Sequence, residues 1–227
     1  MTKKNDKIIV ICVLCIAVAI CAFLFIFYDN KNKAFEYNKN LEELALTISD
    51  KEGVAEAVEV NLQEMAYYII NVEGDINQMA HQYSSEHPEK YWLLKVETTY
   101  DMKDYAKDLA FNSCVRNNIY YIEACKSGLS LTEEELALAS DDAKTIMMNI
   151  SGKQMDMSDF SHEVLYNIEK KLYLASKYVN TLTEKGYKVA DLELEGDYYK
   201  ELLARYNIEE NEAVWGEVVL GELSIEY

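Results

Sequence analysis

A single proline, Pro88, and eight glycines are the strongest chain breakers in 227 residues. Turns and helix ends draw on these two residue types, and a sandwich of many short strands needs a large number of them. Half of the chain is apolar, which is enough to bury a sizeable core. The sequence therefore predicts a mainly α fold.

The segment Ile8–Tyr28 is an uncharged apolar run that is long enough, at about 1.5 Å per residue, to cross the hydrocarbon layer of a membrane. We expect a transmembrane helix over residues 8–28. The lysines of residues 1–7 favour a cytoplasmic tail, which places the bulk of this single-pass chain outside the cytoplasm. Lys31, Lys33 and Lys39 lie just beyond the run and weaken this bias.

Two other interpretations of the apolar run stay open. A cleaved signal peptide needs small residues before the cut; Ala17-Val18-Ala19 is the only fair site, and apolar residues continue beyond it. A lipoprotein needs a small residue before the modified cysteine, but Cys12, Cys15 and Cys21 follow Ile11, Leu14 and Ile20. An uncleaved anchor fits the run better than either.

The formal net charge of −18 is unevenly distributed. Three lysines and one aspartate give residues 1–28 a charge of +2, so the rest of the chain carries −20. Because binding to a phosphate backbone requires clustered lysine and arginine, nucleic acid is not expected as a partner. An acidic extracytoplasmic surface favours basic partners and repels anionic polymers.

A small sheet is predicted from strands that come before and after the helical body in the sequence. Residues 29–53 form a stem or linker, in which Lys31–Ile48 has the spacing of a helix while Leu44–Ile48 also suits a strand. Val54–Val60 is a valine-rich strand after a loop, so a small hairpin is an alternative to the helical stem. The alternating segment Val219–Tyr227 is expected to form a last strand that pairs with Val54–Val60.

Residues 54–227 are predicted to form one helical domain. Asn61 can cap its first helix, with Glu64 at the third position. This helix carries an unbroken apolar stripe: Leu62, Met65, Ile69, Val72, Ile76, Met79 and Tyr83. The stripe is predicted to pack into the core. A seam between two copies, and hence a homodimer, stays open as an alternative.

Three further helices follow. A segment that begins at Met102 is apolar on more than one side and should stop at Gly128, because glycine accepts the left-handed conformation. Thr132 and Glu135 have the spacing of a capping box at the start of the next helix. That helix presents Leu136, Ala139, Ala143, Ile146, Met147 and Ile150 on one face. The last long stripe comprises Phe160, Val164, Ile168, Leu172, Ala175, Val179 and Leu182. A short helix is expected near Tyr198–Tyr206.

The residue pattern gives little indication of catalysis. His81, His87 and His162 lack the spacing that aims two imidazoles at one metal ion, so neither a metal site nor a cofactor is predicted. Cys114 and Cys125 are too far apart on one helix to form a disulfide and are expected to be small core residues, although pairing between chains stays open. Neither a glycine-rich phosphate loop nor a nucleophile motif is found. Eighteen tyrosines and eight methionines instead suit loose apolar recognition.

The order of elements from Val54 to Leu182 resembles the N-terminal chaperone domain of the SurA and PrsA foldases. The resemblance rests on the strand and helix around residues 58–69, on Tyr91-Trp92, and on the helical corner at residues 120–135. Seven residues fit the family's corner pattern "A-x-x-x-G-[IL]-x-[LV]-T-x-[ED]-E": Ala124, Gly128, Leu129, Leu131, Thr132, Glu134 and Glu135. The resemblance implies a helical cradle for unfolded secreted proteins.

The family's parvulin rotamase module is expected after the helical body, but only Thr183–Asp197 separates that body from the closing segments. The resemblance therefore implies binding without peptidyl-prolyl isomerase activity. We expect a membrane-anchored holdase for unfolded or secreted polypeptides. The alternative is a scaffold subunit that binds one folded partner in a cell-envelope complex. Six aromatic residues are the candidates for client binding: Tyr67, Tyr68, Tyr91, Trp92, Tyr120 and Tyr121.

Overall fold

The computed structural model describes residues 35–226, and the chain from Tyr37 onward forms one compact unit. It consists mainly of helices with a small antiparallel sheet, as the sequence predicts. In chain order the elements are η1 Tyr37–Lys39, β1 Leu44–Asp50, β2 Val58–Asn61, α2 Leu62–Tyr83, η2 Pro88–Leu93, β3 Lys95–Glu97, β4 Tyr100–Asp101, α3 Met102–Lys126, α4 Glu133–Asn149, α5 Gly152–Ser158, α6 His162–Glu184, α7 Val189–Leu192, α8 Asp197–Leu203, β5 Tyr206–Glu210 and α9 Glu212–Trp215.

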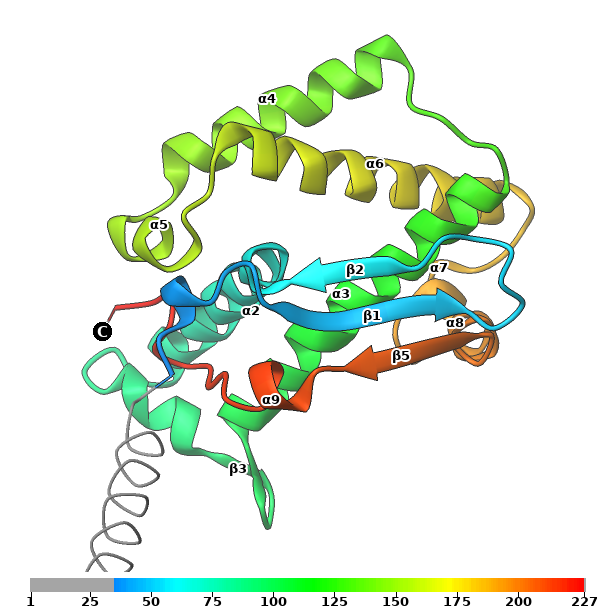
Figure 1. The fold of residues 1–227 in the computed structure, drawn as a ribbon. Coiled ribbons are helices and arrows are strands. Elements are labelled where there is room, and N and C mark those ends of the chain that lie inside the picture. Colours follow the sequence, from blue (N-terminus) through cyan, green and yellow to red (C-terminus); the bar gives the residue numbers. More distant parts are fainter. Residues whose placement is uncertain (1–34, 227) are drawn as a thin grey trace, which may run out of the picture. The chain divides into compact units, whose positions relative to one another are not determined.

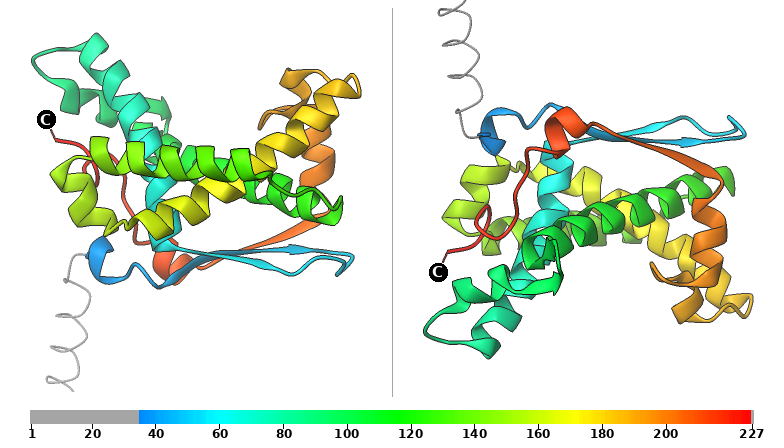
Figure 2. Two further views of the ribbon diagram at one scale, coloured as in Figure 1. Left: turned by 90° about the horizontal axis from the view of Figure 1, so that it is seen from above. Right: turned by 90° about the horizontal axis from the view of Figure 1, so that it is seen from below.

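The sheet has the strand order β2-β1-β5 and is antiparallel throughout. In its centre Leu46 pairs with Val60 on one side and with Glu210 on the other. Figure 1 shows the sheet on one side of the helices, with α3 running behind it. Helix α6 packs against α3, and α4 covers α6, as the view from above in Figure 2 shows.

The helix ends form where the sequence predicts them. The side chain of Asn61 accepts a hydrogen bond from the backbone N–H of Glu64 at 2.9 Å. Gly128 has a φ of +71° directly after α3, which only glycine adopts without strain. Thr132 and Glu135 form the predicted capping box, with N···O distances of 2.7 and 3.2 Å. The corner between α3 and α4 is thus confirmed.

The stripe of α2 is buried for most of its length. Leu62, Met65 and Ile69 are fully buried between the sheet and the other helices. At the far end of the helix, however, Met79 and Tyr83 are 46% and 59% exposed. The stripe itself is therefore buried only as far as Ile76.

The prediction of a terminal strand over Val219–Tyr227 is wrong for the part that the structure describes. Residues 219–226 are irregular, and β5 occupies the third position of the sheet. Gly221 has a φ of +105°, which is incompatible with a strand, and the buried carboxylate of Glu73 accepts the N–H groups of this segment. We call residues 217–226 the C-terminal segment.

The hairpin interpretation of the N-terminal part of the domain is correct, with narrower limits. Leu44–Ile48 lies within strand β1, so it is not helical. The second strand begins only at Val58, which leaves residues 54–57 as part of the connection. Since the compact unit begins at Tyr37, residues 37–53 of the predicted stem belong to the domain. The predicted helix near Tyr198–Tyr206 ends at Leu203, where the chain turns into β5.

The predicted transmembrane helix over residues 8–28 lies outside the described residues. Within residues 35–226, none of the helices combines the length and the apolar character that are needed to cross a membrane.

Candidate binding groove

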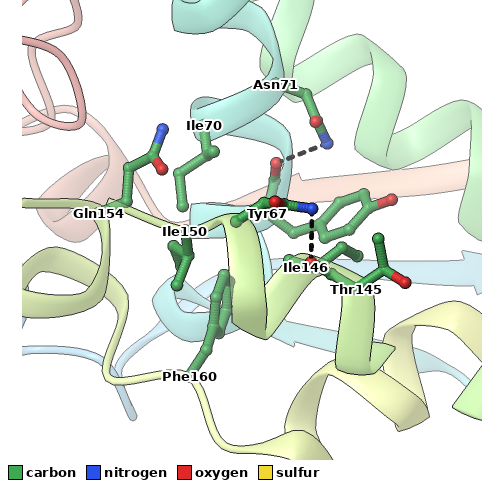
Figure 3. Close-up of a pocket in the computed structure, with 9 residues that line it drawn as sticks. Tyr67, Ile70, Asn71, Thr145, Ile146, Ile150, Gln154 and Phe160 are labelled. Atoms are coloured by element: carbon green, nitrogen blue, oxygen red, sulfur yellow. Dashed lines mark hydrogen bonds between the residues drawn. The ribbon is translucent and has the colours of Figure 1, made fainter. Parts of the chain in front are cut away.

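An open apolar depression lies between α2 and the end of α4. Its volume is about 250 Å³. We call it the α2/α4 groove. The lining residues are Tyr67, Ile70, Asn71, Thr145, Ile146, Asn149, Ile150, Gln154 and Phe160. Figure 3 shows the side chains of Ile70, Ile150 and Phe160 converging from α2, the end of α4 and the loop before α6.

Local sequence signals hold the walls of this groove in place. Helix α4 ends at Ile150, and a capping box between Ser151 and Gln154 starts α5 at once. Asp159 ends α5 in the left-handed conformation, with a φ of +46°. The Gln63 amide donates to the carbonyl of Asp159 at 3.0 Å. The loop that carries Phe160 is therefore fixed to the start of α2.

The polar atoms of the groove are largely used within its own walls. The amides of Asn71 and Asn149 donate to the carbonyls of Tyr67 and Thr145, each four residues earlier on its helix, at 2.9 Å (Figure 3). These bonds turn the donors of both amides toward the helices. The space between the helices is left mainly to the isoleucine side chains and to the rings of Tyr67 and Phe160.

Tyr67 is held by a buried carboxylate. Its hydroxyl donates to Glu169 Oε1 at 3.0 Å, and Glu169 is only 6% exposed in the middle of α6. Burial, followed by the charge of Glu169, raises the pKa of Tyr67 well above its usual value. Burial also raises the pKa of Glu169, although the bond from Tyr67 opposes this. The pair positions the Tyr67 ring as one wall of the groove.

A second tyrosine and carboxylate pair lies close by on α4 and α6. The Tyr173 hydroxyl donates to Asp142 Oδ2 at 2.6 Å, and this hydrogen bond raises the pKa of Tyr173 to about 12. Asp142 also contributes to the raised pKa of Glu169. Both tyrosines are therefore protonated at neutral pH and act as hydrogen-bond donors. Nothing in this arrangement supplies a nucleophile activated by a base.

The six aromatic residues predicted from sequence lie in different environments. Tyr68, Trp92 and Tyr120 are at most 5% exposed and belong to the core. Tyr67 lines the α2/α4 groove. Tyr91 lies in η2, where its ring meets that of Tyr83 at the end of α2, at a centroid distance of 5.6 Å. The six residues do not form one surface.

Tyr121 lines a second depression, which we call the β2 groove. It lies between the chain leading into β2 and the C-terminal part of α3, with a volume of about 480 Å³. Its lining residues are Val54, Ala55, Glu56, Ala57, Val58, Tyr121, Ile122, Cys125 and Lys126. Cys125 is exposed here, whereas Cys114 is buried in α3. The prediction that both cysteines are core residues is correct only for Cys114.

Four of the apolar groove residues were not predicted as candidates: Ile70, Ile146, Ile150 and Phe160. The sequence assigns three of them to apolar faces of α4 and α6, and Ile70 lies beside the α2 stripe. Periodicity shows that such residues lie on the apolar face of a helix. It does not show which part of that face the neighbouring elements leave open to solvent. One local signal for this groove is present in the sequence: Ile70 follows Tyr67 by three residues, so the two side chains share a helix face.

Within residues 35–226, no group of three or more metal-ligating side chains is placed to hold a metal ion. His87 contacts Glu89 at 3.2 Å, and His162 stacks on Tyr166. Comparison of the chain with protein-family models, curated proteins and solved structures finds no match in any of the three.

Proposed function

We propose that the protein is a membrane-anchored, extracytoplasmic holdase that binds unfolded or secreted polypeptides through apolar contact, without catalysis. The observation that carries this proposal is the α2/α4 groove, an apolar depression that remains open after the chain has folded. An exposed apolar depression of this kind is a usual feature of binding surfaces.

The size of the groove favours polypeptide side chains as its occupants. Pockets for small molecules and cofactors usually measure about 300–1,000 Å³ and bury most of the ligand. The α2/α4 groove is smaller, at about 250 Å³, and open to solvent. It suits one or two apolar side chains of a longer chain that continues over the surface.

The chemistry of the groove also favours loose recognition. Its apolar contacts come from isoleucine and aromatic side chains, and its asparagine amides are bound to their own helices. Apolar contact is non-directional, so it selects for hydrophobic side chains and not for one sequence. The resemblance of the α3–α4 corner to the SurA and PrsA chaperone domain supports the same function.

The test is suppression of aggregation of a reduced, unfolded substrate by the fragment comprising residues 31–227. We expect suppression at stoichiometric amounts, and a loss of at least about tenfold in affinity for Ile146→Asn, since burial of one isoleucine contributes about 1.5–3 kcal/mol. Met148→Asn is the matched control, because Met148 lies on the same helix, is 77% exposed and does not line the groove.

Circular dichroism must first show that both variants retain wild-type helicity. Equal activity of Ile146→Asn and wild type would remove the groove from the proposal. A fragment that binds no unfolded chain would end the holdase proposal. Capture of one folded partner at a fixed stoichiometry would favour a scaffold subunit instead.

A further inference from the structure

The three-stranded sheet ends at β2, whose second side has no neighbouring strand within residues 35–226. Figure 1 shows β2 at the border of the sheet, with β1 between it and β5. A free strand edge offers unpaired backbone N–H and C=O groups, which pair readily with another extended chain. The direction of the backbone groups in β2 therefore decides what this edge can bind.

The bonds of the central strand can be assigned from its two ends. The Asn211 N–H donates to the carbonyl of Ala45 at 2.8 Å, and the Lys51 N–H donates to the carbonyl of Arg205 at 3.0 Å. Along a strand, residues alternate in the side toward which they direct their backbone groups. The odd-numbered residues of β1 thus bond toward β5, and the even-numbered residues bond toward β2.

This alternation fixes the direction of β2. Leu46 is opposite Val60 and Ile48 is opposite Val58, so both valines direct their N–H and C=O groups toward β1. Glu59, between them, directs its N–H and C=O groups away from the sheet. Its side chain is exposed, whereas Val60 is fully buried on the helix side. The free edge thus offers one donor and one acceptor at Glu59.

The β2 groove lies along this edge. Val58 lines it from the strand, and Tyr121, Ile122 and Cys125 line it from α3. A strand added to β2 would continue the sheet over α3. Because side chains alternate between the two faces of a strand, every second side chain of the added strand would enter the groove. These inner positions require apolar side chains.

The outer face of the edge is acidic. Glu59 is exposed there, and Glu56, which lines the neighbouring β2 groove, is exposed as well. Lys126, which lines the β2 groove, is engaged by Asp50 at 3.1 Å and by Glu123 at 2.9 Å. A second copy of the chain would set its own acidic edge against this one, and like charges directly opposite each other are unfavourable. A partner strand with basic outer side chains complements the edge.

We propose that the free edge of β2 binds, by antiparallel strand addition, an extended polypeptide segment in which basic and apolar residues alternate. The assignment of this segment to an unfolded client rests on the proposed function. The apolar residues fill the β2 groove, and the basic residues lie on the outer face near Glu59. The residue opposite Glu59 exchanges two hydrogen bonds with it and shares its face, so that residue is a basic one.

The test uses the full chain in phosphatidylcholine nanodiscs and a short, capped, fluorescent peptide of alternating valine and lysine. Binding is followed by fluorescence anisotropy against empty nanodiscs. We expect the alternating peptide to bind at least about tenfold more tightly than a peptide with the same residues in two blocks. A valine and glutamate peptide should not bind, because the edge is acidic.

Glu59→Pro removes the outward N–H but leaves the bonds of Val58 and Val60 to β1, and proline is tolerated at such edge positions. We expect this variant to lose at least about tenfold in affinity for the alternating peptide. Glu59→Gln keeps the backbone and should lose no more than about fivefold, since it removes only an exposed charge. Circular dichroism confirms that both variants are folded.

A second measurement depends on the peptide alone and holds even if Glu59→Pro does not fold. N-methylation of the lysines removes the N–H groups that face Glu59 and should abolish binding. N-methylation of the valines changes the opposite edge of the peptide and should leave binding within about threefold. Equal binding of the two methylated peptides would overturn the proposal.

Two other outcomes separate the inference from the proposed function. Capture of unfolded clients by a chain that does not bind the alternating peptide would overturn the edge site alone. Peptide binding without any capture of unfolded clients would end the holdase proposal and retain the edge site. A dimer of the wild type that is lost in Glu59→Pro would identify a second copy as the occupant and overturn the proposal.

Discussion

Glu73, on α2, fixes the C-terminal segment against this helix, and substitution of Glu73 should destabilise the fold strongly. The side chain is fully buried. Its carboxylate accepts hydrogen bonds from Gly221 N at 2.5 Å, Leu223 N at 3.2 Å, Ser224 N at 2.6 Å and Ser224 Oγ at 2.5 Å. Glu73→Ala removes the carboxylate that these four donors share.

The loss of stability caused by Glu73→Ala is bounded by two possible responses of the C-terminal segment. If the C-terminal segment stays in place, each buried donor without a partner costs about 1–3 kcal/mol. If the segment detaches, Val218, Leu220 and Ile225 lose their burial, at about 1.5–3 kcal/mol each. Removing the carboxylate also removes its own desolvation cost, which reduces either total. We therefore expect the free energy of unfolding to fall by about 3–4 kcal/mol.

Urea unfolding of residues 31–227, followed by circular dichroism, measures this loss. Hydrogen exchange at the amides of Gly221 and Ser224 separates the two responses, since detachment makes both exchange quickly. Glu222→Ala is the matched control. Its side chain is 72% exposed and pairs with Lys103 at 3.1 Å, so the change should stay within about 0.5 kcal/mol. A loss below about 1 kcal/mol for Glu73→Ala, with unchanged amide exchange, would refute the assigned role of this carboxylate.

Three further substitutions test other parts of the structure. Glu169→Gln removes a carboxyl group whose pKa is raised above 4.5 by burial, so in the wild type the native state binds more protons than the unfolded state. The unfolding free energy of the wild type, relative to that of the variant, should therefore fall as the pH rises above 4.5. Urea unfolding at several pH values measures this difference. Gly221→Ala forces an L side chain to a φ of +105° and places its Cβ 3.1 Å from the Trp92 ring, so it should cost more than about 1 kcal/mol and change Trp92 fluorescence. Asn61→Ala removes the cap of α2 and should lower the unfolding free energy by about 0.5–2 kcal/mol in the same urea assay.

Local signals predicted the helix ends well, because each depends on a few adjacent residues. The Asn61 cap, the Gly128 stop and the Thr132 capping box all form as expected. The third strand was not predicted, since Tyr206–Glu210 is short and polar and follows a helical pattern without a break. Its pairing with β1 depends on contacts across more than 150 residues, which no local pattern records.

The C-terminal segment shows how a buried side chain can replace a strand partner. Val219–Tyr227 alternates in sequence as a half-buried strand does, but its burial does not follow this alternation. Leu220 and Ile225, which belong to opposite faces of such a strand, are both buried, whereas Val219 is 60% exposed. The backbone donors of this segment are satisfied by Glu73, which the sequence places among the residues of an apolar helix. Glu73 is one of three acidic residues on α2, and nothing local in the sequence marks it as buried, because its partners lie about 150 residues away.

The two proposed binding surfaces share one structural frame. Asn61 ends β2 and caps α2, so the free strand edge and the Tyr67 wall of the α2/α4 groove belong to one continuous segment. Tyr67 lies in the second turn of α2, which rises about 1.5 Å per residue. Helix α6 contacts both surfaces: Glu169 holds Tyr67, and Lys171 lies 6.0 Å from the ring of Tyr121.

This shared frame has a consequence for affinity. A client that places an apolar side chain in the α2/α4 groove holds the rest of its chain at high effective concentration near the β2 edge. Two weak contacts on rigid elements can then bind a long unfolded chain firmly, while a short segment that reaches only one surface dissociates. Such selection by length distinguishes an unfolded polypeptide from the surface of a folded protein.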